Sequence, residues 1–274
     1  MPAFQFTRLP RSVLIVSGDD RKTFLQGLVS NDVNKVCAES ALWAGFLTAQ
    51  GKFLWDLFLV EQGDTILIDV DQGSAETFKK KLSLYKLRAK VTIEMSDLAV
   101  FALWGGDGAL PAGAVADGRL PEMGGRLYAT QPPDGLEEAP LAAWDALRFT
   151  LGVPDGARDL VADKSLLLEN GFDELGGVDF NKGCYMGQEL TARTKYRGLV
   201  RKRLLPVSFD GDAPQPGTPL LAGEAEAGEM RSGTTGAGLA MVRLEHLRAG
   251  TPLTCGGKAV TVSVPAWAVL PEAD

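Results

Sequence analysis

Short apolar segments separated by tight turns dominate the first hundred residues. Many of these segments are rich in β-branched or aromatic side chains, and turns containing glycine divide several neighbours. Short runs of this kind predict adjacent strands joined by turns, as in an antiparallel meander. The predicted strands lie at residues 13–16, 42–48, 53–60, 65–70, 91–94 and 99–104.

Apolar side chains at helical spacing occur at three places along the chain. The first helix is expected between residues 20 and 31, and the second begins at Ser74 and continues to Tyr85. The third spans residues 141–151 and ends at Gly152, which is a typical C-terminal cap. Helices and mostly antiparallel sheets are therefore expected within one chain, which is an α+β fold.

The character of the sequence changes after Pro206. From there on, β-branched segments alternate with many Gly and Pro turns, which indicates a small β-barrel or sandwich. The glycine-rich segment 233–238 does not have the spacing of a nucleotide-binding loop and is expected to be a turn of this domain. We therefore predict a β-barrel domain at residues 206–274.

Composition and charge narrow the range of functions. The chain has 274 residues, of which 45% are hydrophobic and 23% charged, and this excludes a largely disordered or collagen-like protein. A formal net charge of -7 argues against a surface that binds nucleic acid over its whole extent, but a local basic patch remains compatible. The apolar runs are too short to span a bilayer, so no membrane partner is expected.

The rare side chains exclude several kinds of site. With His246 as the only histidine, zinc or iron sites that need two or more histidines are excluded. Cys37, Cys184 and Cys255 lie far apart in the sequence, which is typical of free thiols in a reducing compartment. Since the N-terminus lacks a basic region followed by an apolar stretch, we expect a soluble cytoplasmic protein.

The densest chemical signal surrounds Cys184. Gly183 and Gly187 let the backbone turn sharply beside it, and Lys182 lies two positions before it. A nearby cation and exposed backbone N–H groups favour the thiolate, so the segment indicates a reactive thiol. A small buried side chain is the alternative, because free cysteine is often a core residue. The residues alone do not decide between these two roles.

A basic segment follows this cysteine, and neither Asp nor Glu occurs between Leu190 and Phe209. In an acidic protein it is the best candidate for an anion site, which would hold the carboxylates of a small ligand or the phosphates of RNA. The alternative is a solvated strand face covered by long basic side chains. The basic residues are Arg193, Lys195, Arg197, Arg201, Lys202 and Arg203.

The segment Lys-Gly-Cys-Tyr-Met-Gly-Gln-Glu resembles the signature of the YgfZ-type folate-binding proteins. These are bacterial relatives of mitochondrial factors that assist iron–sulfur cluster assembly. Weaker matches, which include Phe24-Leu-Gln-Gly and Tyr85-Lys-Leu-Arg, extend the resemblance from Val13 to Arg203. The motif residues are Lys182, Gly183, Cys184, Tyr185, Gly187, Gln188 and Glu189.

The resemblance implies a fold related to the aminomethyltransferase (T-protein) of the glycine cleavage system, in which three domains surround a central opening that binds tetrahydrofolate. For this chain it implies a folate-binding region at 1–205, composed of two α+β subdomains at roughly 1–95 and 96–205, before the barrel at 206–274. It also implies a role in maintaining iron–sulfur enzymes and, through one of them, in tRNA methylthiolation.

Folate has a flat pteridine and a carboxylate tail, so its site needs an apolar slot, polar anchors and a cation at the mouth. The resemblance aligns Trp144 with a tryptophan at the folate and Asp56 with an acidic group near the folate amine. A core Trp and an Asp that faces solvent are the alternatives that the residues alone allow. The candidate cofactor-binding residues are Trp144, Asp56, Arg148, Arg193 and Arg197.

Cys184 and Asp56 are the candidate catalytic residues. The T-protein has an acidic pair where this chain has Trp55 and Asp56, and a pteridine-contacting Glu where it has Thr150, so aminomethyl transfer would lack two carboxylates. The leading hypothesis is a folate-dependent accessory protein whose partners are iron–sulfur enzymes or assembly proteins. The alternatives are a folate-dependent one-carbon transferase or demethylase and a tRNA-binding module. Because a single thiol cannot build a four-cysteine site, no stable metal site is expected.

Overall fold

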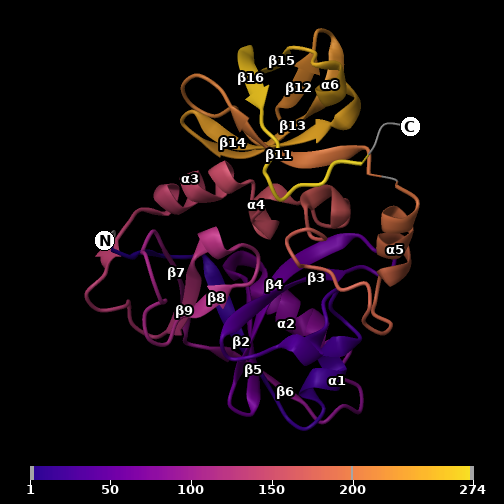
Figure 1. The fold of residues 1–274 in the computed structure, drawn as a ribbon. Coiled ribbons are helices and arrows are strands. Elements are labelled where there is room, and N and C mark those ends of the chain that lie inside the picture. Colours follow the sequence, from indigo (N-terminus) through magenta and orange to yellow (C-terminus); the bar gives the residue numbers. More distant parts are fainter. Residues whose placement is uncertain (1–2, 199, 272–274) are drawn as a thin grey trace.

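The protein combines a large sheet with a closed barrel (Figure 1). The computed structural model describes residues 3–198 and 200–271, so the outer ends of the predicted domains 1–205 and 206–274 lie outside the described residues. Within these residues, ten strands form one sheet in the order β10-β1-β7-β9-β8-β3-β4-β5-β2-β6. The strands are β1 (Gln5–Arg8), β2 (Arg11–Ser17), β3 (Ser40–Leu47), β4 (Phe53–Gln62), β5 (Thr65–Asp71), β6 (Thr92–Ser96), β7 (Ala99–Trp104), β8 (Val115–Asp117), β9 (Gly125–Ala129) and β10 (Glu137–Glu138).

Side chains alternate between the two faces of β4, and each face has its own core. Leu57 and Leu59 pack with Phe78 of α2 (Ala75–Leu84) on one face. Phe58 and Val60 pack with the cluster that contains Trp144 on the other. Because successive strand residues point to opposite faces, Asp56 belongs to the Trp144 side. The meander predicted from the apolar segments is confirmed, since β3, β4 and β5 pair antiparallel in sequence order.

The two predicted subdomains share this sheet. Strand β1, from the start of the chain, pairs with β7 and β10, and Ser40 of β3 pairs in parallel with Ala116 of β8. Short helices cover the sheet and connect it to the barrel; in the described residues none is long and apolar enough to cross a membrane. The helices besides α2 are α1 (Arg21–Gln26), α3 (Leu141–Leu151), α4 (Gly156–Asp159), α5 (Gln188–Tyr196) and α6 (Leu244–Ala249).

The C-terminal strands form a closed barrel, as predicted, in the order β11-β14-β13-β12-β15-β16. Its first strand begins at Lys202, before the predicted domain boundary at Pro206. The glycine-rich segment 233–238 is the turn of the β13–β14 hairpin, where Gly233 pairs with Gly238. The barrel strands are β11 (Lys202–Ser208), β12 (Pro219–Ala222), β13 (Ala225–Thr234), β14 (Ala237–Arg243), β15 (Leu253–Cys255) and β16 (Lys258–Val262).

Helix α3 lies between the sheet and the barrel (Figure 1). It ends, as predicted, at Gly152, which adopts a left-handed conformation with φ 73°. A Cβ at this glycine would lie 2.4 Å from Cγ of Pro265 and 3.1 Å from Cγ of Pro206. The indole Nε1 of Trp267 donates to the Leu151 carbonyl at 2.7 Å. The end of α3 is therefore enclosed by residues of the barrel and of the segment that follows it.

Replacing Gly152 by Ala is expected to lower the free energy of unfolding by roughly 2–4 kcal/mol, because left-handed strain adds to the clash with the two prolines. Gly63→Ala is the matched control, since Gly63 also has positive φ but has open space around its Cα. Gly63→Ala should lower the free energy of unfolding by only about 1–2 kcal/mol. Chemical denaturation measures both values, and equal losses would contradict the packing at α3.

Candidate functional site

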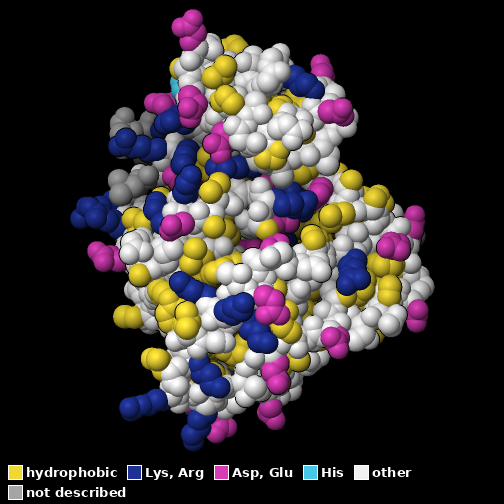
Figure 2. Space-filling model, turned by 180° about the vertical axis from the view of Figure 1, so that it is seen from behind, with side chains coloured by type: hydrophobic (Ala, Val, Ile, Leu, Met, Phe, Trp, Pro, Cys, Tyr) yellow, Lys and Arg dark blue, Asp and Glu magenta, His cyan; other side chains and the backbone are white. Residues whose placement is uncertain are grey.

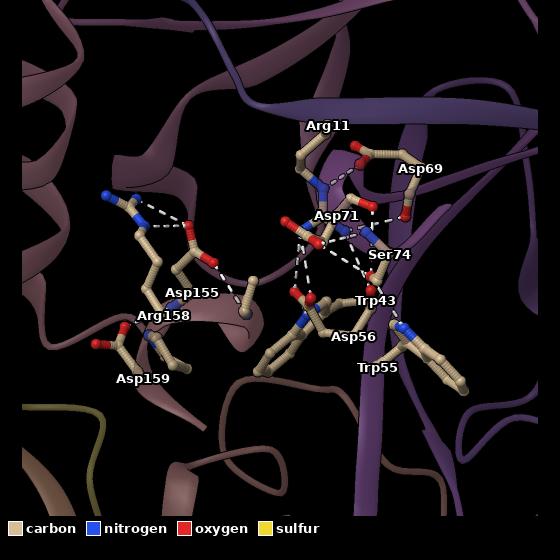
Figure 3. A network of polar contacts seen from close by, with 12 residues as sticks. Arg11, Trp43, Trp55, Asp56, Asp69, Asp71, Ser74, Asp155, Arg158 and Asp159 are labelled. Carbon is tan, nitrogen blue, oxygen red and sulfur yellow. Dashed lines mark hydrogen bonds and ion pairs between the residues drawn. The ribbon is translucent and has the colours of Figure 1, made fainter. Parts of the chain in front are cut away.

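Asp56 is buried at the centre of the sheet, with 3% of its surface exposed. Its carboxylate accepts hydrogen bonds from Nη1 of Arg11 at 3.2 Å and from Nε1 of Trp43 at 3.3 Å. Gly156, the first residue of α4, lies so close that a Cβ there would be 2.4 Å from Oδ1 of Asp56. Figure 3 shows this enclosed carboxylate between Arg11 and Trp43. Asp56 is thus a paired internal group rather than an acid that faces solvent.

The ion pair of Asp56 is one end of a buried chain of charges. Arg11 donates through Nε to Asp69, whose Oδ2 accepts from Nη1 of Arg126 at 2.6 Å. Arg126 also contacts Asp117 at 3.3 Å, and Asp117 in turn binds Arg119 at 2.8 Å. All of these side chains are at least nine-tenths buried. Charges removed from water need such partners, so each group stabilises the placement of the next.

The three guanidinium groups of this chain share one aromatic ring. The Cζ atoms of Arg11, Arg119 and Arg126 lie 5.2, 4.8 and 3.4 Å from the ring centroid of Phe58. Like charges crowd at this ring, and the three aspartates neutralise them. The face of β4 that carries Asp56 and Phe58 therefore holds a balanced set of three cations and three anions.

A second set of ion pairs joins α3, α4 and the barrel. Arg148, at 1% exposure, donates to Asp145 at 2.8 Å, to Asp159 at 2.6 Å and to Ser232 of β13 at 2.7 Å. Every nitrogen of its guanidinium is thereby used within the protein. Arg148, a predicted cofactor-binding residue, links α3 and α4 to the barrel through these contacts. Arg158 also binds Asp145, at 2.7 Å.

A small cavity separates these two sets of ion pairs. Asp56, Trp144 and Arg148 all line it, so the structure brings together three of the five predicted cofactor-binding residues. Figure 3 shows Asp155 and Arg158 near α4 across from Asp56. The cavity volume is about 40 Å³, whereas sites for cofactors usually measure about 300–1,000 Å³. Its polar groups are largely paired with one another. Tetrahydrofolate does not fit among these residues as they stand.

The other two predicted cofactor-binding residues lie elsewhere. Arg193 is exposed on α5, and Arg197 is exposed just after it. Neither lines the central cavity, and Arg197 lines a separate groove beside the barrel. The strand face suggested for the start of the basic segment is wrong, because residues 188–196 are helical. Thr150 is also remote from the cavity, since its exposed side chain donates to the Ala146 carbonyl at 2.9 Å.

Cys184 is exposed on the loop that precedes α5. Lys182 holds this loop from inside the protein, because its Nζ donates to the carbonyl oxygens of Gln26, Val29 and Asn31 at 2.8, 2.6 and 2.6 Å. Burial lowers the pKa of Lys182 to about 8, although Asp32 nearby acts in the opposite direction. The ammonium therefore serves three carbonyls, and the prediction that it activates the neighbouring thiol is not supported.

The remaining motif residues also hold the loop. The Gly187 backbone has φ 83°, and a Cβ there would lie 2.6 Å from the Thr48 carbonyl oxygen. The side chain of Gln188 accepts from the Tyr185 backbone N–H at 3.0 Å. Gly183 and Glu189 are exposed on either side. The motif thus builds a frame that presents the thiol outward.

Cys184 is separate from the other thiols and from the central cavity. Cys37 is half-buried and Cys255 is buried in the barrel, where burial raises the pKa of its thiol. Among the described residues, no three His, Cys, Asp or Glu side chains are grouped to hold a metal ion. Within the described part of the chain, Cys184 therefore has no neighbouring side chains that would complete a metal site with it.

Sequence reasoning missed most of the buried charge network. Asp69 lies in an apolar run, as Asp56 does, and the same argument could have identified it. Arg11 and Arg126 gave no such signal, because a basic residue at the end of a strand usually faces solvent. Their role depends on pairings between residues far apart in the chain.

Comparison with known proteins supports the fold and points to a function. Residues 201–270 match the family model described as "CAF17, C-terminal beta-barrel domain". Aminomethyltransferase T of the glycine cleavage system from Bartonella henselae has the same fold, with a TM-score of 0.77 and 16% identity over 97% of this chain and 86% of that one. This confirms the predicted T-protein-like α+β fold.

Curated relatives are more similar in sequence. The human "Iron-sulfur cluster assembly factor IBA57, mitochondrial" is 35% identical over 94% of this chain and 83% of its own length. A Neurospora crassa homologue of that name is 36% identical over 75% of this chain, which spans only 54% of that longer protein. These relatives are mitochondrial by name, so they contradict the predicted cytoplasmic location. Sparse free thiols indicate a reducing compartment but do not identify which one.

Asp117→Asn is expected to lower the free energy of unfolding at neutral pH by about 3–5 kcal/mol, because it leaves buried cations without their partner. Burial by itself raises the pKa of Asp117, but Arg119 and Arg126 outweigh it and hold that pKa below its usual value. The stabilisation is therefore present above the unfolded pKa of about 3.9 and is lost as the pH falls through the lower folded value.

Denaturation curves recorded across acid pH measure this loss. The variant should lack the part of the acid dependence that Asp117 contributes. Asp107→Asn is the control, since Asp107 is exposed, and its stability should match that of the parent protein. A loss below 1 kcal/mol in Asp117→Asn would contradict the network, since breaking a buried pair costs about 3–5 kcal/mol.

Calorimetric titration with tetrahydrofolate is expected to give no saturable binding at micromolar concentrations. Entry of the pteridine would have to break buried ion pairs around Asp56 to create space. Trp144→Ala tests whether any bound folate lies in the cavity, since Trp144 lines it. The ring centroids of Trp144 and Trp104 lie 5.3 Å apart. Saturable binding to the parent protein would contradict this expectation, and its loss in Trp144→Ala would place the ligand in the cavity.

Proposed function

Because this chain belongs to the family of iron–sulfur cluster assembly factors named IBA57, we propose that it assists cluster assembly on partner proteins through the Cys184 thiol. The observation that carries the proposal is the exposure of this thiol on a loop that Lys182 holds from inside. An exposed thiol can bind iron or exchange with a sulfur species once it is deprotonated. A rigid loop keeps it available for that contact at little cost in conformational entropy.

The cluster is cargo in this proposal. Cys184 contributes one ligand, and the partner contributes the others, because Cys37 and Cys255 lie elsewhere in the fold. The contact is transient, since one thiolate holds a cluster less firmly than a complete set of ligands. The partners are therefore iron–sulfur enzymes or the proteins that build and carry their clusters.

The resemblance to YgfZ-type proteins extends the proposal to a client enzyme that methylthiolates tRNA. In this extension the chain affects tRNA only through the cluster of that enzyme. No step runs through tetrahydrofolate, because the central cavity does not fit it as the residues stand. The function proposed here concerns the loop of Cys184 alone.

A one-carbon transferase has less support. Such an enzyme needs a carboxylate that can reach its substrate, but Asp56 is enclosed by Arg11, Trp43 and Gly156. Trp55 packs against Phe78 on the opposite face of the sheet, so a carboxylate at that position would not meet Asp56. A tRNA-binding module has no specific contact in its favour, since Lys195 on α5 is paired with Asp173.

In a strain that lacks this protein, Cys184→Ala is expected to leave cluster-dependent enzyme activity near the level of the empty vector. The substitution removes the sulfur but leaves the Lys182 and Gly187 contacts that shape the loop. Enzyme activity in extracts, normalised to the amount of the variant by immunoblot, measures the effect.

Cys37→Ala is the matched control, because it removes a half-buried thiol outside the motif. It should restore activity to the level of the parent protein. Full rescue by Cys184→Ala, at equal protein levels, would exclude the thiol role.

A further inference from the structure

A groove of about 810 Å³ lies between the barrel and the segment after α5. Its lining includes Arg197 and Arg201 of that segment together with Met241 of β14 and Leu244 of α6. It shares no lining residue with the central cavity near Asp56. A volume of this size falls within the usual range for small-molecule sites. The groove is therefore a second place in this fold where a ligand has room.

The groove is cationic although the chain as a whole is acidic. Six basic and four acidic side chains line it, in a chain of net charge -7. Figure 2 shows Lys and Arg side chains gathered on the flank where the barrel meets the rest of the molecule. The basic residues are Arg197, Arg201, Lys202, Arg231, Arg243 and Arg248.

Three of the four glutamates of the groove are paired with a Lys or Arg of the same groove, whereas Glu245 contacts His246. Glu169 contacts Lys202 at 3.7 Å, and Glu226 contacts Arg243 at 3.7 Å. Burial raises the pKa of Glu169, an effect that Lys202 offsets only in part. The acidic residues therefore do not cancel the whole positive charge.

Arg197 and Arg201 carry the positive charge that the glutamates do not cancel. Both are exposed, and within residues 3–198 and 200–271 neither forms an ion pair with a carboxylate. Arg231 adds an unmet donor, because its Nε is buried without a hydrogen-bond partner although the side chain pairs with Glu229. A buried N–H without an acceptor costs free energy, and an anion in the groove offers acceptors to such groups.

The walls indicate the kind of anion. Val200, Met241 and Leu244 give an aliphatic surface, and none of the lining residues in the described part of the chain is aromatic. A nucleobase would find no ring to stack on. The glutamates would repel an extended phosphate backbone at several points, whereas a compact anion can sit among the arginines alone.

We propose that this groove binds a compact polyanion with two or more phosphate or carboxylate groups. Guanidinium forks bind both kinds of oxyanion in a bidentate manner, so the shared chemistry is the closely spaced oxyanion pair. The site is additional to the thiol function of Cys184 and does not depend on it. In this proposal the basic segment after α5 binds its own ligand, outside the central cavity.

The test is calorimetric titration of the full-length protein with pyrophosphate and, separately, with citrate at low salt. We expect saturable binding with one site per chain, stronger for pyrophosphate if the ligand carries phosphates and for citrate if it carries carboxylates. Arg201→Gln should weaken binding about tenfold, because it removes a charged hydrogen-bond donor. Because Arg201 is exposed, the variant should unfold at the same temperature as the parent protein.

Arg193→Gln is the matched control, since Arg193 lies on α5 but does not line the groove. Its affinity should stay within about twofold of the parent value. The proposal fails if neither anion binds saturably, or if Arg193→Gln weakens binding as much as Arg201→Gln. It also fails if single-stranded RNA binds more tightly than both anions and Arg193→Gln lowers the RNA affinity as much as Arg201→Gln does. That result would indicate a diffuse contact with phosphates.

Discussion

Three guanidinium groups packed against one phenylalanine ring are the constraint on which the centre of this protein depends. Arg11, Arg119 and Arg126 reach Phe58 from separate segments, and none of them tolerates burial without a carboxylate. The aspartates come from β4, β5 and β8, so their pairing requires those strands to be in register. The strand register and the pairing of the buried charges therefore depend on each other.

This network leaves little room for a ligand at the centre of the sheet, and the function proposed for Cys184 lies at the surface. In a fold shared with an aminomethyltransferase, the interior is occupied by ion pairs and the thiol sits on an outer loop. A common fold does not determine a common site. Here the same scaffold supports Cys184 through Lys182, whose three hydrogen bonds end on the last residue of α1 and on the segment that follows it.

Local pattern was sufficient for much of the fold. Strand periodicity located the meander, and Gly152 marked the end of α3 because its left-handed conformation is a local property. Helix α5 escaped detection since its buried positions are Thr191 and Thr194 rather than an apolar stripe. The pairing of Asp69 with Arg126 depends on strand order, and the sequence alone carries no direct signal of it. The motif led to Cys184, but it gave no sign that the Lys182 side chain turns inward to the carbonyls of Gln26, Val29 and Asn31.

The hydrogen bond from Trp267 to the end of α3 joins residues made at very different times. During synthesis on the ribosome, α3 emerges well before the barrel strands and before Trp267. Until that indole arrives, the Leu151 carbonyl and the surface around Gly171, which the Trp267 ring covers, stay open to water and to other chains. Domains generally fold as they emerge, yet this junction closes only after Trp267 has been synthesised. The end of α3 therefore stays uncovered for the whole time in which the barrel strands are made.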